Sequence, residues 1–140
     1  MPKLAREIVV LAGALLFSCS RQKTVSIDDL RSDITAGESL AAEEVFFIDY
    51  LNQHAGMRHF AQGHMQYLTE EAARSAKQLQ ESKPAPGADQ QLELCRNLLA
   101  RLHEELSSSV RHIGNPAALL GDKQALIALR STLEQARSAL

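Results

Sequence analysis

Apolar residues recur at intervals of three and four along most of this chain, which is the spacing of amphipathic helices. Between Glu38 and Ser82 the chain has no proline and is rich in alanine, glutamate, leucine and glutamine. We therefore predict one long helix over this stretch. Gly56 and Gly63 are its weak points, because glycine inside a helix costs about 1 kcal/mol relative to alanine. The apolar stripe consists of Leu40, Phe47, Leu51, Ala61, Met65, Leu68, Ala72 and Leu79.

A second helix follows a loop at 83–88, whose two prolines and one glycine cannot continue a helix. Asp89 is placed to cap this helix, and the sequence Gly114-Asn115-Pro116 ends it. The apolar residues of this helix have a spacing close to that of a coiled-coil seam. They are Leu92, Cys95, Leu99, Leu102, Leu106, Val110 and Ile113.

The last helix has Asp122 as its expected N-cap. Near the other end of the chain, Ser26 is expected to cap a short helix that Gly37 interrupts. No segment alternates apolar and polar residues at period two, so we expect no sheet. The apolar stripe of the last helix contains Leu119, Leu126, Leu129, Leu133, Ala136 and Leu140.

The predicted fold is all-α, a small antiparallel bundle of three helices, of which one is long and open to a kink. A straight helix of roughly 45 residues would run about 67 Å, whereas the other two would reach only about 36 and 30 Å. The apolar end of the long helix would then overhang its partners. If that helix instead breaks near Gly56 or Gly63 and folds back, the fold becomes a four-helix bundle.

The first 18 residues have the layout of a secretory signal peptide. Lys3 and Arg6 precede the ten-residue apolar run Ile8–Phe17, which is too short to span a bilayer core of about 30 Å. The sequence Leu16-Phe17-Ser18-Cys19 at its end resembles the lipobox of bacterial lipoproteins. This resemblance implies cleavage before Cys19 and acylation of that residue, with palmitate as a typical attached chain.

The resemblance also implies a location for the protein. Ser20 follows the acylated cysteine, and in proteobacterial lipoproteins the usual retention signal at this position is aspartate, so export to the outer membrane is implied. The chain would then comprise a signal peptide at 1–18, a lipidated tether with a short helix at 19–37, and a bundle domain at 38–140 facing the periplasm. In that oxidising compartment Cys95 would be the remaining thiol, either buried and inert or paired with another chain.

Charge and motif content exclude several function classes. The formal net charge of −2 argues against a nucleic-acid binder. The chain has no Gly-x-Ser-x-Gly elbow, no glycine-rich phosphate loop, and no His-Glu-x-x-His or Cys-x-x-Cys motif. We therefore predict a protein that is not an enzyme and holds no cofactor.

Five histidines raise the alternative of periplasmic copper or haem handling. On a continuous helix His54, Met57 and His64 would share one stripe, because Met57 follows His54 by three residues and His64 follows Met57 by seven. Two imidazoles and a thioether form a donor set suited to Cu(I). A boundary of the core, with methionine filling packing gaps, would produce the same pattern.

Our main functional prediction is a lipid-anchored helical module that binds another protein of the cell envelope, as an assembly, pilotin-like or exclusion or immunity accessory. Early in the long helix the apolar arc is wider than one stripe, which indicates partner contacts in addition to core contacts. The residues concerned are Val45, Phe46, Phe47, Ile48, Tyr50 and Leu51. Two alternatives stay open for them: they fill the core, or the chain self-assembles into a homo-oligomer.

Overall fold

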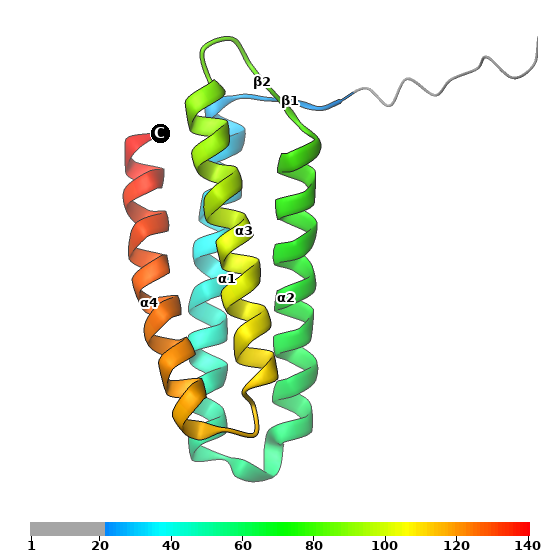
Figure 1. Ribbon diagram of the computed structural model, residues 1–140, viewed down its shortest axis with the longest axis vertical. Helices are drawn as coiled ribbons and strands as arrows, with labels where there is room; N and C mark the ends of the chain where they lie inside the picture. The colour runs from blue at the N-terminus through cyan, green and yellow to red at the C-terminus, as the bar shows by residue number, and fades with distance from the viewer. Residues whose placement is uncertain (1–21) are drawn as a thin grey trace, which may run out of the picture.

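The computed structural model describes residues 22–140, which form four long helices that run in alternating directions along one axis (Figure 1). The all-α prediction is confirmed, and the preferred count of three helices is wrong. The predicted signal peptide, the lipobox and Ser20 lie outside the described residues. The elements are β1 (Thr24–Val25), α1 (Ile27–Gln53), the 3₁₀ turn η1 (Ala55–Met57), α2 (Arg58–Glu81), β2 (Lys83–Pro84), α3 (Asp89–Arg111) and α4 (Pro116–Ala139).

The expected long helix is divided in two by a tight turn. Helix α1 ends at Gln53, and the backbone of His54 leaves the helical region with φ −134° and ψ 67°. The Met57 amide donates to the His54 carbonyl at 3.0 Å, which closes the turn around Gly56. Gly56 is thus the weak point at which the chain folds back, whereas Gly63 continues inside α2. Because the chain folds back, no apolar end of a long helix projects beyond its partners, and the apolar stripe of α2 is covered by α3.

Helix α1 starts earlier than expected and is continuous through Gly37. Its N-terminus is a capping box in which the Ser26 hydroxyl accepts from the Asp29 amide and the Asp29 carboxylate accepts from the Ser26 amide. The expected interruption at Gly37 is wrong because this glycine is a packing site. A Cβ atom there would lie 2.9 Å from Leu99 Cδ2 and 3.3 Å from Leu102 Cδ2, so glycine lets α1 pack closely against α3, and a larger residue would require these leucine side chains to shift.

The core is aliphatic and lies where the four helices face one another. Helix α1 packs mainly against α4, α2 packs mainly against α3, and α1 and α3 meet across the centre. Leucines of α3 and α4 supply half of the largest fully buried side chains, and α1 and α2 supply the other half. Phe47 is the one aromatic side chain among the buried hydrophobic residues of the described chain.

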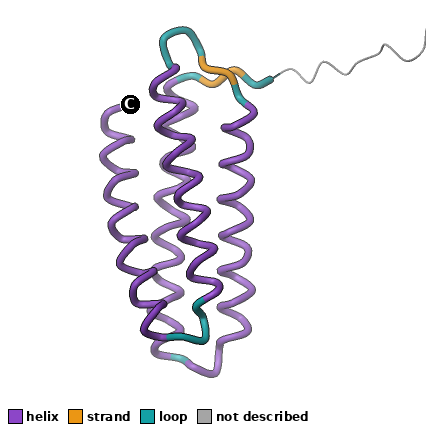
Figure 2. Tube along the Cα trace, viewed as in Figure 1, coloured by secondary structure: helices purple, strands orange, loops and turns teal. Residues whose placement is uncertain are grey.

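A short parallel strand pair closes one end of the bundle, shown in orange in Figure 2. The Lys83 amide donates to the Lys23 carbonyl and the Ala85 amide donates to the Val25 carbonyl, both at 2.9 Å. The intervening Pro84 has no amide hydrogen and needs none, because alternate residues make the ladder bonds. The expectation of no sheet is therefore wrong, and strands of two residues are too short to produce a period-two pattern.

The loops that join the later helices depend on caps at other positions than expected. Asp89 is the first residue of α3 rather than its N-cap, where its carboxylate suits the helix dipole. Gly87, two residues before Asp89, has φ +84°, the left-handed conformation that favours glycine.

The N-cap of α4 is Asn115, whose side-chain oxygen accepts from the Ala118 amide at 3.2 Å. The prediction that Asp122 caps α4 is wrong, because the helix already starts at Pro116, nearly two turns earlier.

Candidate functional site

The hairpin of α1 and α2 gathers nearly all of the aromatic residues of the protein. Five of the six phenylalanines and tyrosines in the sequence lie between positions 46 and 67, and the sixth, Phe17, belongs to the predicted signal peptide. Phe46, Phe60 and Tyr67 are 61%, 59% and 53% exposed, although such rings usually contribute to a core. We call the group formed by Phe46, Phe47, Tyr50, His54, Phe60, His64 and Tyr67 the aromatic surface.

Phe47 is the buried floor of the aromatic surface, and other rings pack onto it from both helices. The His64 ring stacks on it, with centroids 4.1 Å apart and planes inclined by 29°. Phe46 meets it edge to face at 5.5 Å, and Phe60 reaches it from α2 at 6.2 Å. Ring pairs at these separations contribute about 0.5–1.5 kcal/mol each beyond the area that they bury. The exposed rings are therefore held in place by a buried one.

The rest of the aromatic surface follows α1 to its end. Tyr50 stacks between two neighbours, with its centroid 6.3 Å from that of Phe46 and 4.4 Å from that of His54. Across the hairpin, His64 Nε2 lies 2.7 Å from Glu43 Oε1, which links α2 to α1. The contact positions the imidazole ring over Phe47.

The structure divides the six predicted partner-binding residues between two roles. Phe46 is exposed and Tyr50 is half-buried, so these side chains are accessible to a partner, whereas the half-buried Val45 packs against the core. Phe47, Ile48 and Leu51 are buried and belong to the core, which is the alternative that the sequence left open for them. The wide apolar arc therefore combines an inner core face and an outer exposed face.

Sequence reasoning missed the contribution of α2 to this surface. Phe60 and Tyr67 are exposed there, together with Met57 in the turn. On one straight helix, residues 46 and 60 would lie about 21 Å apart at 1.5 Å per residue. They come together only because the chain folds back at Gly56, and a glycine was the one signal of that event in the sequence.

The predicted copper ligands do not share a helical stripe. His54 caps α1, Met57 ends the turn, and His64 lies within α2, so the continuous helix on which their alignment depended is not present. His64 faces Glu43 and the His54 ring stacks on Tyr50. Within residues 22–140 no group of three or more histidine, cysteine, aspartate or glutamate side chains is arranged to hold a metal ion.

A small cavity lies at the same end of the bundle as the turn between α1 and α2. Its volume is about 230 Å³, and its wall combines four apolar residues with the polar side chains of Asn52 and Arg58. The space is sufficient for one apolar side chain of a bound polypeptide. The lining residues are Leu51, Asn52, Arg58, Ile113, Pro116 and Leu119.

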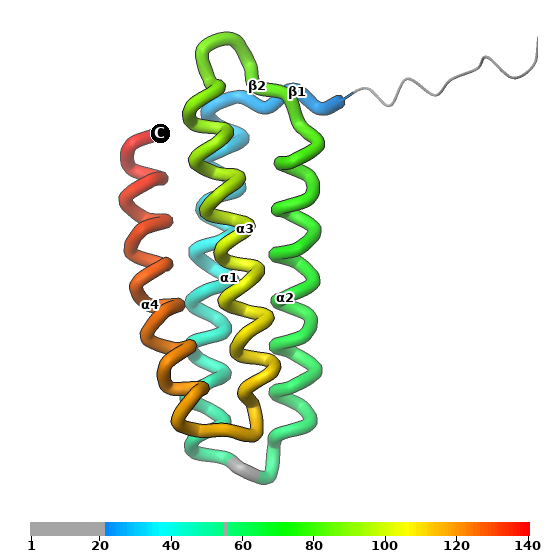
Figure 3. The backbone as a smooth tube through the Cα atoms, in the orientation of Figure 1, coloured from blue at the N-terminus to red at the C-terminus, as the bar shows by residue number. Residues whose placement is uncertain are grey.

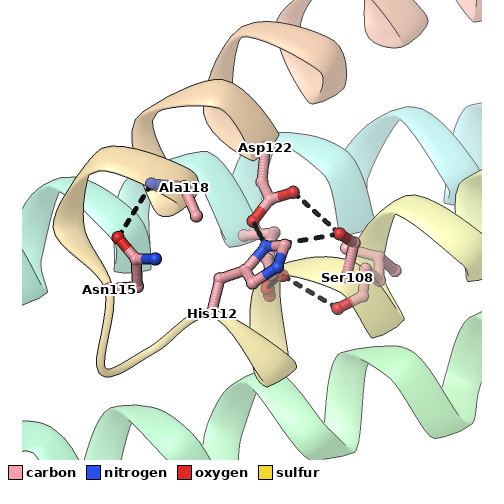
Figure 4. Close-up of polar contacts among 8 residues, drawn as sticks. Ser108, His112, Asn115, Ala118 and Asp122 are labelled. Atoms are coloured by element: carbon pink, nitrogen blue, oxygen red, sulfur yellow. Dashed lines mark hydrogen bonds and ion pairs between the residues drawn. The ribbon is translucent and has the colours of Figure 1, made fainter.

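A serine, a histidine and an aspartate meet where α3 ends and α4 begins (Figure 4). Asp122 Oδ2 lies 2.7 Å from His112 Nδ1, and the Ser108 hydroxyl donates to Asp122 Oδ1 at 2.8 Å. Ser108 Oγ is 3.5 Å from the same Nδ1 atom. A nucleophilic triad needs the serine on one imidazole nitrogen and the carboxylate on the other. This cluster lacks that order and instead ties α4 to α3.

A second polar group, Glu44, is completely buried between α1, α3 and α4. Burial, more than the nearby Asp122 carboxylate, raises the pKa of Glu44 to about 8. The Ser109 hydroxyl lies within hydrogen-bond reach of both Glu44 Oε1 and the Leu106 carbonyl. A hydroxyl has a single hydrogen to donate, so both contacts are satisfied when Glu44 is protonated and donates to Ser109.

Cys95 is buried in α3, and burial raises the pKa of its thiol to about 11, with a smaller effect from Asp33. A thiol in this environment is a poor nucleophile and behaves as a small apolar side chain. This agrees with the first of the two alternatives for this cysteine.

None of the four helices is both long enough and apolar enough to cross a membrane over residues 22–140. Comparison of the chain with protein-family models, curated proteins and solved structures gives no significant match. Its function is therefore inferred from its own residues.

Proposed function

We propose that the protein is an outer-membrane lipoprotein, attached through acylated Cys19, whose bundle binds another envelope protein through the aromatic surface. One observation carries this proposal. The aromatic residues are absent from the faces of α3 and α4, which they could help to fill, and are gathered on one hairpin where three of them are mostly exposed.

Exposed aromatic rings on a fixed floor are well suited to protein binding. Aromatic residues are enriched in the centres of interfaces, and a few such anchors carry most of the binding energy. Packing on Phe47 and the His64–Glu43 contact hold the rings in position before binding. The entropy lost on association is thereby reduced. The cavity beside Arg58 adds a recess for one apolar side chain of the partner.

The lipid anchor would strengthen such an interaction without adding contacts. Each buried CH₂ of an acyl chain contributes about 0.8 kcal/mol, so several chains hold the protein on the membrane durably. A partner at the same membrane then meets the domain at a high effective concentration. A secretion pilotin, an assembly accessory and an exclusion or immunity factor all work under these conditions, and we propose a role of this kind.

Crosslinking in intact cells, with a matched pair of variants, tests the proposal. The full-length protein is expressed in its host, crosslinked and purified, and its partners are identified by mass spectrometry. Phe46→Glu places a charge on the aromatic surface, and Ile127→Glu places the same charge on α4 at a residue that is 50% exposed. We expect one dominant envelope partner, lost in Phe46→Glu and retained in Ile127→Glu, with an unchanged helical signal in both.

Two results would contradict this function. Equal capture of the partner by both variants would exclude the aromatic surface as the binding site. Self-crosslinks alone would indicate self-assembly instead. The anchor is tested separately with Cys19→Ser, which should abolish incorporation of labelled palmitate. Retention of the label in this variant would contradict acylation at Cys19.

A further inference from the structure

The aromatic surface and the first described residues lie at opposite ends of the bundle. In Figure 3 the chain enters at the end closed by β1 and β2, whereas the turn between α1 and α2 is at the other end. The 27 residues of α1 connect the two ends, and at 1.5 Å per residue they span about 40 Å. The length of the bundle therefore separates the end closed by β1 and β2 from the end that carries the aromatic surface.

The distance from the proposed anchor to the bundle is short. The carbonyl of Lys23 is already bonded to the Lys83 amide, so the chain is fixed to the bundle from this residue onward. Four residue steps separate Cys19 from Lys23, and even a fully extended chain covers only about 14 Å in that number of steps. An acylated Cys19 would therefore keep the strand end close to the lipid headgroups.

The side of α2 between the two ends does not suit a membrane surface. A helix that lies in the interface carries a continuous apolar face bordered by lysine and arginine. Beyond Tyr67, toward the strand end, the exposed charged residues of α2 are instead Glu70, Arg74, Lys77 and Glu81. Both signs of charge are present there, so a bundle lying on this side would place the carboxylates of Glu70 and Glu81 against the membrane.

We infer that the bundle stands upright on its strand end and holds the aromatic surface tens of ångströms from the membrane that anchors it, to bind a protein that extends into the aqueous compartment. This inference rests on the proposed function, since it presupposes the acylated Cys19. It assigns a protein, rather than lipid, as the binding partner of the aromatic surface. Exposed aromatic rings can also insert among lipid headgroups, so the two alternatives need an experiment that separates them.

Tryptophan fluorescence gives a direct test, because the protein has no tryptophan of its own. Three single variants of the full-length acylated protein report on the two ends: Thr24→Trp at the strand end, and Phe46→Trp and Phe60→Trp on the aromatic surface. All three positions are exposed, and two substitutions keep an aromatic ring. Each variant is bound to vesicles of phosphatidylcholine and phosphatidylglycerol, with or without a headgroup-attached spin-label quencher.

We expect the quencher to remove most of the emission of Thr24→Trp and to leave that of Phe46→Trp and Phe60→Trp unchanged. Quenching of the two surface variants as well would show that the bundle lies on the membrane, and would overturn the inference. Lack of quenching in all three vesicle-bound variants would overturn it too, because the strand end would then be remote from the lipid.

Two further results have separate meanings. If the acylated protein fails to float with the vesicles, the anchor itself fails, and with it the proposed function. If the emission of Phe60→Trp shifts with protein concentration in the absence of vesicles, the aromatic surface binds a second copy of the chain. That result would overturn our inference that the aromatic surface binds a different protein. As a control, a helical spectrum like that of the unmodified protein shows that each variant is folded.

Discussion

The imidazole ring of His64 lies against the ring of Phe47, with a centroid separation of 4.1 Å. One residue comes from α1 and the other from α2, and together they form the inner layer of the aromatic surface. Glu43 holds the outer edge of the imidazole at 2.7 Å. This pair joins the two helices of the hairpin, and it separates the buried aromatic residue from the exposed ones that we assign to binding.

Substitution of the two adjacent phenylalanines should have opposite consequences. Phe47→Ala removes a buried ring and should lower the free energy of unfolding by about 3–5 kcal/mol. Phe46→Ala removes an exposed ring and should cost at most about 1 kcal/mol, while it weakens partner binding. Urea unfolding followed by circular dichroism measures both changes. Similar losses of stability would show that Phe46 also belongs to the core.

Substitution by alanine should change the stability of the protein in opposite directions at two glycines inside helices. Gly37→Ala puts a methyl group 2.9 Å from Leu99 Cδ2 in a closely packed interface, and should destabilise the protein by about 1–3 kcal/mol. Gly63→Ala meets nothing within 4 Å and should stabilise α2 by about 0.5–1 kcal/mol. Thermal denaturation of the two variants is the measurement. A stabilised Gly37→Ala protein would mean that α1 and α3 pack less tightly than described.

Stability should depend on pH through Glu44. The ordinary pKa of this carboxyl group is 4.5, and burial raises it to about 8 in the folded chain. Between these values the folded chain keeps the Glu44 proton and the unfolded chain releases it. The folded state then binds more protons, so the contribution of Glu44 to stability falls as pH rises through this window and levels off above about pH 8.

Glu44→Gln isolates this effect, because glutamine has a similar shape and does not titrate. We expect the thermal midpoint of the unmodified protein to fall more steeply between about pH 5 and 8 than that of the variant. At pH 9 the variant should be the more stable of the two. Parallel pH curves for both proteins would contradict a buried, protonated Glu44.

The contact between α3 and α4 should depend on Asp122. Asp122→Ala removes the acceptor of the Ser108 hydroxyl and the partner of His112, and should lower the free energy of unfolding by about 1–3 kcal/mol. Asn115→Ala, which removes the cap of the same helix, should cost about 1 kcal/mol. Chemical denaturation compares them. A smaller loss for Asp122→Ala than for Asn115→Ala would show that solvent replaces the cluster at little cost.

Local patterns in the sequence were sufficient to predict the helical class and the later helices. The stripe from Leu92 to Leu106 marks the buried face of α3, and the prolines at 84 and 86 mark the loop before it. Gly37 and Gly56 show the limit of such reasoning. Both are glycines in a helical pattern, yet one lies inside a helix against Leu99 and the other lies in the turn. Tertiary packing, which the local sequence does not encode, decides between these outcomes.

The candidate site was predicted in part for a related reason. A wide apolar arc identified Phe46 and Tyr50 on α1, because neighbouring residues on one helix show their relationship in the spacing. The same spacing could not separate Phe47, which faces α2, from Phe46, which faces solvent. The contribution of Phe60 requires the fold of the chain, as does the position of His64 away from His54 and Met57.

The parallel pair of β1 and β2 also determines how the molecule carries mechanical load. If Cys19 is acylated as we propose, a partner that pulls the bundle away from the membrane applies tension to the chain just before Thr24. The Lys83–Lys23 and Ala85–Val25 bonds join β1 to β2 at the point where that tension enters the bundle. Force therefore enters the loop between α2 and α3 as well as the start of α1.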